Sequence, residues 1–240
     1  MKRANENLYC SVISGGVSMN TKQKIIRSAL SLFEEKGFHK VSVREISEKA
    51  SVSNGGFYHH FKSKDELLYQ INASILTHVI ENSKKAAMKN NSPIEKLAGM
   101  IRVFIHTFDI YHQEVTVMYR DNHYLAPDFF IKIKETRNEY QKYIFNIIQE
   151  GINEGEIRKN IPIILSGMAI FGLINWTYQW YEKNRSLSIE DIATIYIDFI
   201  FNALLTKEAK SNPNYHHFFI DENSEFYQVN NLSLEKFSLI

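Results

Sequence analysis

The stretch GFHKVSVREISEKASVSNGGFYHHFKSKDELL, residues 37–68, carries the pattern that decides the fold. Gly37 is placed to end a preceding helix, because glycine readily adopts the positive φ found at helix C-termini. Ser42 and Ser63 are each followed three residues later by glutamate, which is the spacing of a capping box at a helix N-terminus. Ser53 can cap a very short helix between them. The stretch therefore predicts two short helices, separated by a tight break, and the start of a third.

Outward from this stretch, the chain is predicted to be helical almost throughout. Thr21 can cap a helix whose apolar residues fall on one face, and the helix that begins at Ser63 continues well past residue 68. Only four prolines occur, and no strand-like alternation is sustained. Further helices are expected over residues 93–108, 127–151, 162–181 and 188–205. The predicted fold class is all-α, with a three-helix helix-turn-helix module at the N-terminus.

Composition limits the class of protein. The chain has 240 residues, 44% of them apolar, and its 28 basic and 27 acidic residues leave a net charge of +1. One cysteine, Cys10, excludes an internal disulfide framework and a cysteine-rich zinc site. Residues 19–70 hold nine Lys and Arg against six Asp and Glu, a balance of +3, which favours one basic module that meets a polyanion. We expect an intracellular, cytoplasmic globular protein.

One uncharged stretch, residues 160–181, is long enough for a membrane span. It includes a proline, two glycines and several polar residues, and no second such stretch accompanies it. A helix buried on most sides within an assembly explains it better than a span.

The glycine pair of the short helix that Ser53 caps favours a close approach to a partner. Gly55 and Gly56 each cost about 1 kcal/mol in a helix interior. A recognition helix presents its first turn to base edges and brings peptide N–H groups to phosphate, and the loss is understandable if the surface must approach a duplex. Tyr58 and His59 can reach phosphate or bases. Lys64 opposes the helix dipole in the first turn of the next helix, and a phosphate bound beside it would remove that conflict.

These residues, in order, resemble the DNA-binding module of the TetR family of bacterial transcriptional regulators. The resemblance implies an all-α regulator with a C-terminal helical domain for ligand binding and dimerisation. Ser51 stands where the family usually has glycine, and Asn54 where lysine is common, so the operator sequence cannot be inferred from relatives. The positions at which the family touches DNA, with Arg44 and Ser53 added as candidates, are Ser42, Arg44, Ser53, Asn54, Gly55, Gly56, Tyr58, His59 and Lys64.

Two recognition helices are needed, because one covers only a few base pairs and half-sites lie about 34 Å apart. The last two predicted helices fit a homodimer interface of four helices, in which glycines allow close approach. The alternative is that the same residues close the core of a monomer. The residues assigned to dimerisation are Gly167, Gly172, Tyr196, Phe199, Ile200 and Ala203.

The middle helices are rich in aromatic residues, which are either core or the lining of the effector pocket that the family resemblance implies. A finer resemblance, carried by residues 119–121, 150–156, 175–181 and 187–188, is to the TetR-family repressors of fatty-acid and sterol-ring degradation, which respond to acyl-coenzyme A. It implies an acyl chain among the aromatics and an anionic head on Arg120, Arg137 or Arg102. The alternatives are an internal Arg120–Asp121 ion pair and an interface role for residues 175–181. The predicted ligand-binding residues are Phe104, Phe108, Tyr119, Arg120, His123, Arg137, Tyr140, Asn175 and Trp176.

No residue set points to catalysis, because neither a nucleophile–base pair nor a phosphate loop is found, and the scattered histidines lack metal-ligand spacing. We therefore expect no enzyme, no metal and no cofactor beyond a small-molecule effector. Two alternatives stay open: a multidrug efflux repressor that senses aromatic cations, and a helical lipid carrier or enzyme without a DNA role. The expected organisation is a flexible leader (1–20), the DNA-binding domain (21–68), the ligand-binding and dimerisation domain (69–206) and a weakly ordered extension (207–240).

Overall fold

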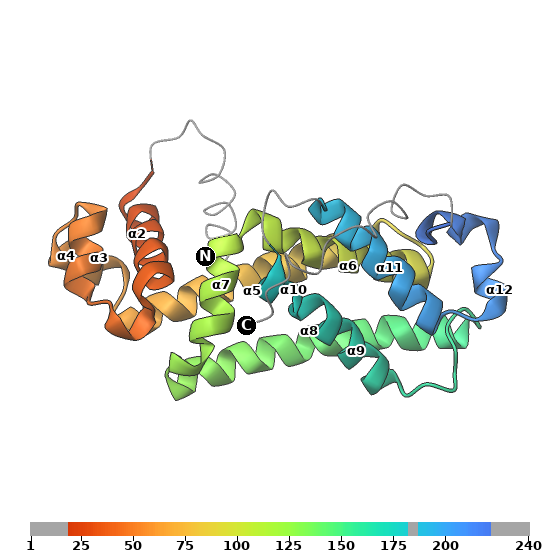
Figure 1. Cartoon of the computed structure of the whole chain (residues 1–240). Helices are drawn as coiled ribbons and strands as arrows, with labels where there is room; N and C mark the ends of the chain where they lie inside the picture. The colour runs from red at the N-terminus through yellow and green to blue at the C-terminus, as the bar shows by residue number, and fades with distance from the viewer. Residues whose placement is uncertain (1–18, 182–186, 222–240) are drawn as a thin grey trace. The chain divides into compact units, whose positions relative to one another are not determined.

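The computed structural model describes residues 19–181 and 187–221, and all of its regular elements there are helices (Figure 1). The only β feature in these ranges is a single bridge between Ile157 and Leu205. The prediction of an all-α protein is confirmed. No helix in the described part of the chain is long and apolar enough to cross a membrane.

The chain divides into two compact units. The first unit runs to Ile75 and adds Gln113–Glu135, and the second unit holds Leu76–His112 and the residues from Thr136 onward. The predicted boundary at residue 68 differs from this division. The long helix α5 (Lys64–Met88) continues through residue 68 without a break, and most of α7 (His112–Asp121) belongs to the same unit as the N-terminal helices.

The N-terminal helices of the first unit begin with α2 (Thr21–Lys36), α3 (Val43–Ala50) and α4 (Asn54–His60). Asn20, rather than the predicted Thr21, caps α2 and forms a capping box with Gln23. Both Asn20 and Thr21 are good caps, so sequence alone could not choose between neighbours. Gly37 ends α2 with φ +80°, as predicted, and donates its N–H to Phe33 O at 2.8 Å.

Large apolar side chains hold these helices together. Phe33, Ile46, Phe57 and Phe61 are completely buried, and the rings of Phe33 and Phe38 meet edge to face at 5.1 Å. Phe38 belongs to the short turn η1 (Phe38–Lys40) between α2 and α3. The first unit is completed by α7, by η2 (Asn122–Tyr124) and by the start of α8 (Pro127–Asn153).

The second unit contains the rest of α5 and α8 with α6 (Pro93–Ile110), α9 (Ile163–Asn175), α10 (Thr177–Trp180) and α11 (Ile189–Leu204). Helices α6 and α11 pack along each other (Figure 1). The single helix predicted over residues 162–181 is broken at Trp176, where α9 ends and the one-turn α10 begins. Ser188 caps α11 through a capping box with Asp191.

Part of the predicted weakly ordered extension is folded. Residues 207–221 form α12 (Lys207–Lys210) and η3 (Pro213–Phe218), and η3 packs on α11. The rings of Phe201 and Phe218 are 5.2 Å apart, and the Tyr215 hydroxyl donates to Glu156 Oε1 at 2.5 Å. Aromatic residues without helical period therefore anchor irregular turns. Residues 1–18, 182–186 and 222–240, including most of the predicted leader, lie outside the described residues.

Candidate nucleic-acid interface and effector-binding residues

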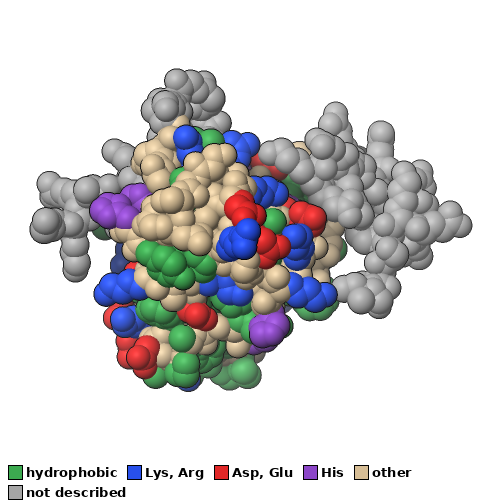
Figure 2. All heavy atoms as spheres, turned by 90° about the vertical axis from the view of Figure 1, so that its left-hand side faces the viewer, with side chains coloured by type: hydrophobic (Ala, Val, Ile, Leu, Met, Phe, Trp, Pro, Cys, Tyr) green, Lys and Arg blue, Asp and Glu red, His purple; other side chains and the backbone are tan. Residues whose placement is uncertain are grey.

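The short helix α4 is fixed on one side and exposed on the other. Ser53 caps it by accepting the N–H of Gly56 at 3.0 Å, and Phe57 and Phe61 anchor it in the core. On the outer side Tyr58 keeps 55% of its surface exposed, and Ser53, Asn54, Gly55 and His59 are exposed as well. Figure 2, which faces the side of Figure 1 where α3 and α4 lie, shows Lys and Arg side chains scattered among polar and backbone surface. The predicted DNA-facing residues of α4 therefore share one accessible surface.

The glycine pair of α4 is not required by the fold of the chain itself. Neither Gly55 nor Gly56 has a positive φ. A Cβ added to Gly55 would lie 3.7 Å from the Ser53 hydroxyl, and one added to Gly56 would lie 3.4 Å from it, which are ordinary contacts. Alanine would stabilise a helix by about 1 kcal/mol relative to glycine, and the packing of the folded chain gives no reason for either glycine.

Helix α3 supplies two more of the predicted contacts. Ser42 caps α3, and its backbone N–H and hydroxyl both donate to Glu45 Oε2, at 2.8 and 2.9 Å. These hydrogen bonds, with the Lys36 ammonium 3.0 Å away, lower the pKa of Glu45 to about 2. Arg44 is exposed and paired with Glu48 one turn on, at 2.8 Å, so its guanidinium can exchange that partner for a phosphate at little cost.

Lys64 differs from the expectation that it faces phosphate. Its ammonium turns inward, donates to Phe38 O at 2.8 Å and Val41 O at 2.7 Å, and lies 4.3 Å from the centre of the Phe38 ring. Partial burial lowers its pKa. The conflict with the helix dipole is thus relieved by carbonyls of the preceding turn, and Lys64 holds the turn between α2 and α3 in place.

Arg120 lies in the first unit, and the ion pair left open by the sequence is present. Its guanidinium donates to Phe33 O and to Glu34 O (3.2 Å) in the last turn of α2 and pairs with the buried Asp121 at 2.9 Å. A cation at a helix C-terminus is favoured by the helix dipole. The side chain therefore joins α7 to α2, and these bonds all lie within the first unit. Tyr119 and His123 also fall in this unit, with the His123 ring against Tyr124.

The second unit holds the aromatic cluster, in which Phe104 is central. Its ring contacts Phe108 (6.0 Å between ring centres), Tyr140 (6.5 Å) and Phe171 (6.4 Å). The buried hydroxyl of Tyr140 donates to Ser83 Oγ at 2.8 Å, and burial raises the pKa of Tyr140. Arg137, half-buried on α8, belongs to the same unit. Three of the predicted ligand-binding residues, Phe104, Phe108 and Tyr140, are therefore brought together.

Sequence reasoning missed polar residues of α5 in this unit. Besides Ser83, His78 and Asn82 lie on α5, with Tyr111 Oη 3.2 Å from His78 Nδ1 and the Asn82 amide equally close to the imidazole. Burial lowers the pKa of His78. The signal was the polar group His78, Asn82 and Ser83 on a helix that also carries Ile71, Ile75 and Val79 in the core.

Two polar side chains of α6, Arg102 and His106, share one partner on α11. Arg102 and His106 both contact Glu190 at the start of α11, with His106 Nε2 2.6 Å from Glu190 Oε2. Among the described residues no cluster of His, Cys, Asp and Glu could hold a metal ion.

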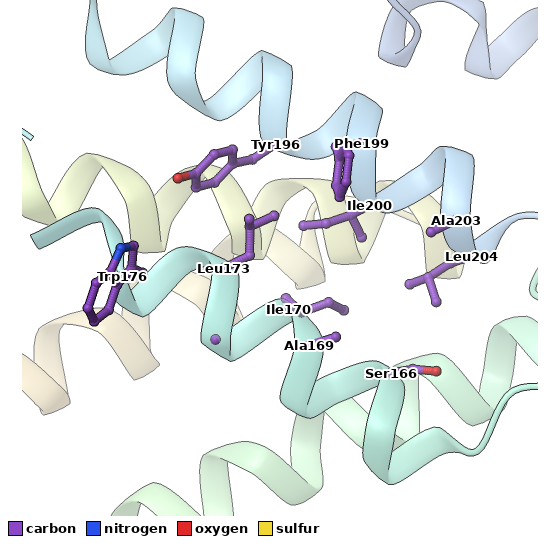
Figure 3. Close-up of a pocket in the computed structure, with 11 residues that line it drawn as sticks. Ser166, Ala169, Ile170, Leu173, Trp176, Tyr196, Phe199, Ile200, Ala203 and Leu204 are labelled. Atoms are coloured by element: carbon purple, nitrogen blue, oxygen red, sulfur yellow. The ribbon is translucent and has the colours of Figure 1, made fainter. Parts of the chain in front are cut away.

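An apolar groove of about 410 Å³ lies between the outer faces of α9 and α11 (Figure 3). Its rim and surroundings keep large apolar side chains in solvent, with Phe199 67% and Trp176 57% exposed. Gly167 is not on this face: it is buried, and a Cβ there would overlap the ring of Phe145. Close packing of α9 on its own chain explains that glycine. Of the residues assigned to dimerisation, the groove is lined by Gly172, Tyr196, Phe199, Ile200 and Ala203.

Two family models match the chain. Residues 25–71 match the bacterial regulatory proteins of the tetR family, and residues 90–204 match the tetracyclin repressor-like C-terminal domain. The chain belongs to the TetR family. It is therefore a DNA-binding transcriptional regulator and not an enzyme, and regulators of this family dimerise and bind small-molecule effectors.

Several relatives of this TetR-family chain have names that describe a role. The HTH-type transcriptional repressor KstR2 of Mycolicibacterium smegmatis is 25% identical over 185 residues, which cover 76% of this chain and 90% of that protein. The fatty acid metabolism regulator protein of Bacillus subtilis is 24% identical over 77% of this chain and 95% of its own length. A crystal structure of AibR in complex with isovaleryl coenzyme A and operator DNA has the same fold, with a TM-score of 0.68 and 21% identity over 76% of this chain and 98% of AibR.

Proposed function

We propose that this chain is a homodimeric repressor of fatty-acid or other lipid-degradation genes that an acyl-coenzyme A thioester releases from its operator. The observation that carries the DNA-binding part is the glycine pair of α4, which the chain's own packing does not need. As a regulator of genes it acts in the cytoplasm.

The operator contacts are assigned to the outer surfaces of α3 and α4. Asn54 can pair with the N6 and N7 atoms of adenine, and the peptide N–H groups at the start of α4 suit a phosphate. Tyr58 is the largest exposed side chain of this helix. Lys64 supports the surface from behind through its bonds to Phe38 and Val41. The residues assigned to DNA are Ser42, Arg44, Ser53, Asn54, Gly55, Gly56, Tyr58 and His59.

The groove between α9 and α11 is assigned to the second copy of the chain. Exposed apolar surface of this kind is typical of a protein interface, and an isologous dimer places the same face on both partners. A Cβ added to Gly172 would meet no neighbour within 4 Å, so this glycine leaves room for a partner helix. Phe199 and Trp176, which line the groove and are more than half exposed, are the side chains best placed to reach the copy of the groove on the partner.

The effector part rests on the aromatic cluster of the second unit and on the names of the relatives. Phe104, Phe108, Tyr140 and Phe171 offer apolar surface for an acyl chain, and the Tyr140–Ser83 pair offers buried hydroxyls to a carbonyl group. The relatives named above include a fatty acid metabolism regulator and a protein bound to an acyl thioester. Helix α5 begins next to α4 and carries Ser83, so it connects effector and operator surfaces along one element.

The test is release of a labelled duplex that the protein has itself selected from a random pool. We expect long-chain acyl-coenzyme A to lower duplex binding in fluorescence anisotropy, and we expect coenzyme A alone or a free fatty acid at the same concentration to leave most of it. Undiminished binding at saturating acyl-coenzyme A would reject the effector class. Release by an aromatic cation instead would favour the multidrug alternative.

A further inference from the structure

Arg102, His106 and Glu190 form a cluster that the fold does not use for capping. Arg102 and His106 are one turn apart on α6, and both reach the carboxylate of Glu190 on α11. The side chains keep 31%, 37% and 53% of their surface exposed, in that order. The capping box of α11 is made by Ser188 and Asp191, so Glu190 is not needed to begin that helix. Its carboxylate instead contacts Arg102 and His106 of α6.

We propose that Arg102 and His106 form an anion-binding subsite that Glu190 occupies in the effector-free protein, and that the phosphate-bearing end of the effector displaces this carboxylate. The ligand class is a phosphate ester joined to an apolar chain. The inference rests on the proposed function for the identity of the effector's apolar chain. It adds the residues that bind the phosphate-bearing end of the effector and the carboxylate of the protein that competes with it.

Comparison of the arginines favours Arg102 over Arg120. The guanidinium of Arg120 is bound to two backbone carbonyls of α2 and to the buried Asp121. Moving this guanidinium to an effector would leave the carboxylate of Asp121 buried without its partner. Glu190, in contrast, is more than half exposed, and water can replace its partners when it leaves. An exposed ion pair of this kind is worth about 1 kcal/mol or less, which a multivalent phosphate can exceed.

The subsite is near the aromatic cluster along α6. Phe104 lies midway between Arg102 and His106 in sequence, about 3 Å along the helix axis from each. Its ring faces Tyr140 and Phe171, while the side chains of Arg102 and His106 reach Glu190 on α11. An effector with a flexible arm between its acyl chain and its phosphates can therefore use both surfaces of one helix.

Displacement of Glu190 also has a structural consequence. The contact ties the first turn of α11 to α6, and the same α11 carries Tyr196, Phe199 and Ile200 on the groove face. Release of this tie lets α11 shift relative to α6, which would change the face assigned to the second copy. An effector that binds only the displaced arrangement stabilises it by the difference between its affinities for the two states.

The experiment measures binding of coenzyme A and of palmitoyl-coenzyme A by calorimetry to the full chain and to three variants. Glu190→Gln removes the competing charge, and we expect both ligands to bind about 5-fold more tightly. Arg102→Gln removes a charge-assisted contact and should weaken both about 10-fold. Lys96→Gln, which breaks the other ion pair of α6 with Glu150, is the matched control and should change neither.

Thermal melting of each variant checks that it is folded, and Arg102→Lys, which keeps a charge, should recover part of the affinity. Equal affinities of wild type, Glu190→Gln and Arg102→Gln would overturn the subsite. If palmitoyl-coenzyme A still released wild type from the duplex in that case, the proposed function would stand without the subsite. If wild type were never released, but the variants still changed binding of coenzyme A in the expected directions, the subsite would stand and the proposed function would fail.

Discussion

The outer surface of α4 and the outer faces of α9 and α11 are both exposed, but they are built from opposite kinds of residue. The surface of α4 consists of glycine, polar side chains and one tyrosine, all compatible with water. The other face leaves Ile164, Leu165 and Phe199 more than 60% exposed. A polar surface costs little when unoccupied, so it suits a partner that comes and goes. A broad apolar face is unfavourable in water and suits a permanent partner.

The largest effect is expected from a charge on the apolar face. Phe199→Asp places a carboxylate where the second copy would bury a ring, and should weaken the dimer about 100-fold or more. Analytical ultracentrifugation measures the change, and the duplex affinity should fall with it because both half-sites are needed. Helical circular dichroism should be kept, because Phe199 is 67% exposed in the single chain.

Met88→Asp is the matched control for this change. Met88 is 79% exposed on α5, away from the residues that line the groove, so the dimer should persist. A Phe199→Asp protein that stays dimeric at nanomolar concentration would show that the apolar face has another purpose.

The next effect separates stability from DNA binding on α4. Gly55→Ala with Gly56→Ala should raise the free energy of unfolding by about 1 kcal/mol per site, since neither Cβ meets a close neighbour. The same variant should bind the selected duplex about 10-fold more weakly, because a methyl group then separates the helix from the duplex. Chemical denaturation and anisotropy measure the two quantities.

Opposite signs in these two measurements are the decisive result. If both the free energy of unfolding and the duplex affinity rose, the glycines would have no role in close approach. A duplex of unrelated sequence provides the control for binding that is not specific.

The same contrast explains which parts of the molecule could be predicted from sequence. Gly37, Ser42 and Ser53 act through local backbone geometry, so their spacing alone placed α2, α3 and α4. Gly167 and Lys64 act through partners that are distant in sequence, Phe145 in one case and Phe38 in the other. A single sequence shows which residue stands at each position, but it does not reveal which distant neighbour that residue meets.

The candidate effector residues show this limit most clearly. Phe104, Phe108 and Tyr140 were predicted from aromatic content and do meet, whereas Ser83, the hydrogen-bond partner of Tyr140, was not foreseen. Arg120 was one of three arginines that the finer family resemblance offered for the anionic head of the effector, with an ion pair to Asp121 as the alternative. The structure gives it the carbonyls of α2, which are 86 and 87 residues away in the chain.

A smaller effect tests whether Lys64 supports the α4 surface or touches the duplex. Lys64→Met keeps most of the side-chain length but loses both bonds to Phe38 O and Val41 O, and should lower the free energy of unfolding by about 1–3 kcal/mol. If Lys64 only positions the turn, the slope of log affinity against log salt concentration should match that of wild type. Loss of a phosphate contact would instead reduce the slope by about 0.9.

Arg44→Gln is the comparison for that measurement. Arg44 keeps 79% of its side chain exposed, and its variant should show the smaller salt slope with little change in stability. A reduced slope in Lys64→Met would mean that its third N–H reaches phosphate despite the two carbonyls.

The smallest expected effect is at Ser51, between α3 and α4. This residue ends α3 with φ 55° and ψ 43°, in the left-handed region that L-residues other than glycine avoid. Ser51→Gly should relieve that strain and raise the free energy of unfolding by about 0.5–1 kcal/mol, less than the strain itself because glycine also makes the unfolded chain more flexible. Its duplex affinity should equal that of wild type, since Ser51 precedes α4 and is not among the residues assigned to DNA. A Ser51→Gly protein that gained stability but lost duplex affinity would indicate that the serine sets the angle between α3 and α4. The polar surface of α4 would then depend on this turn as well as on its own residues.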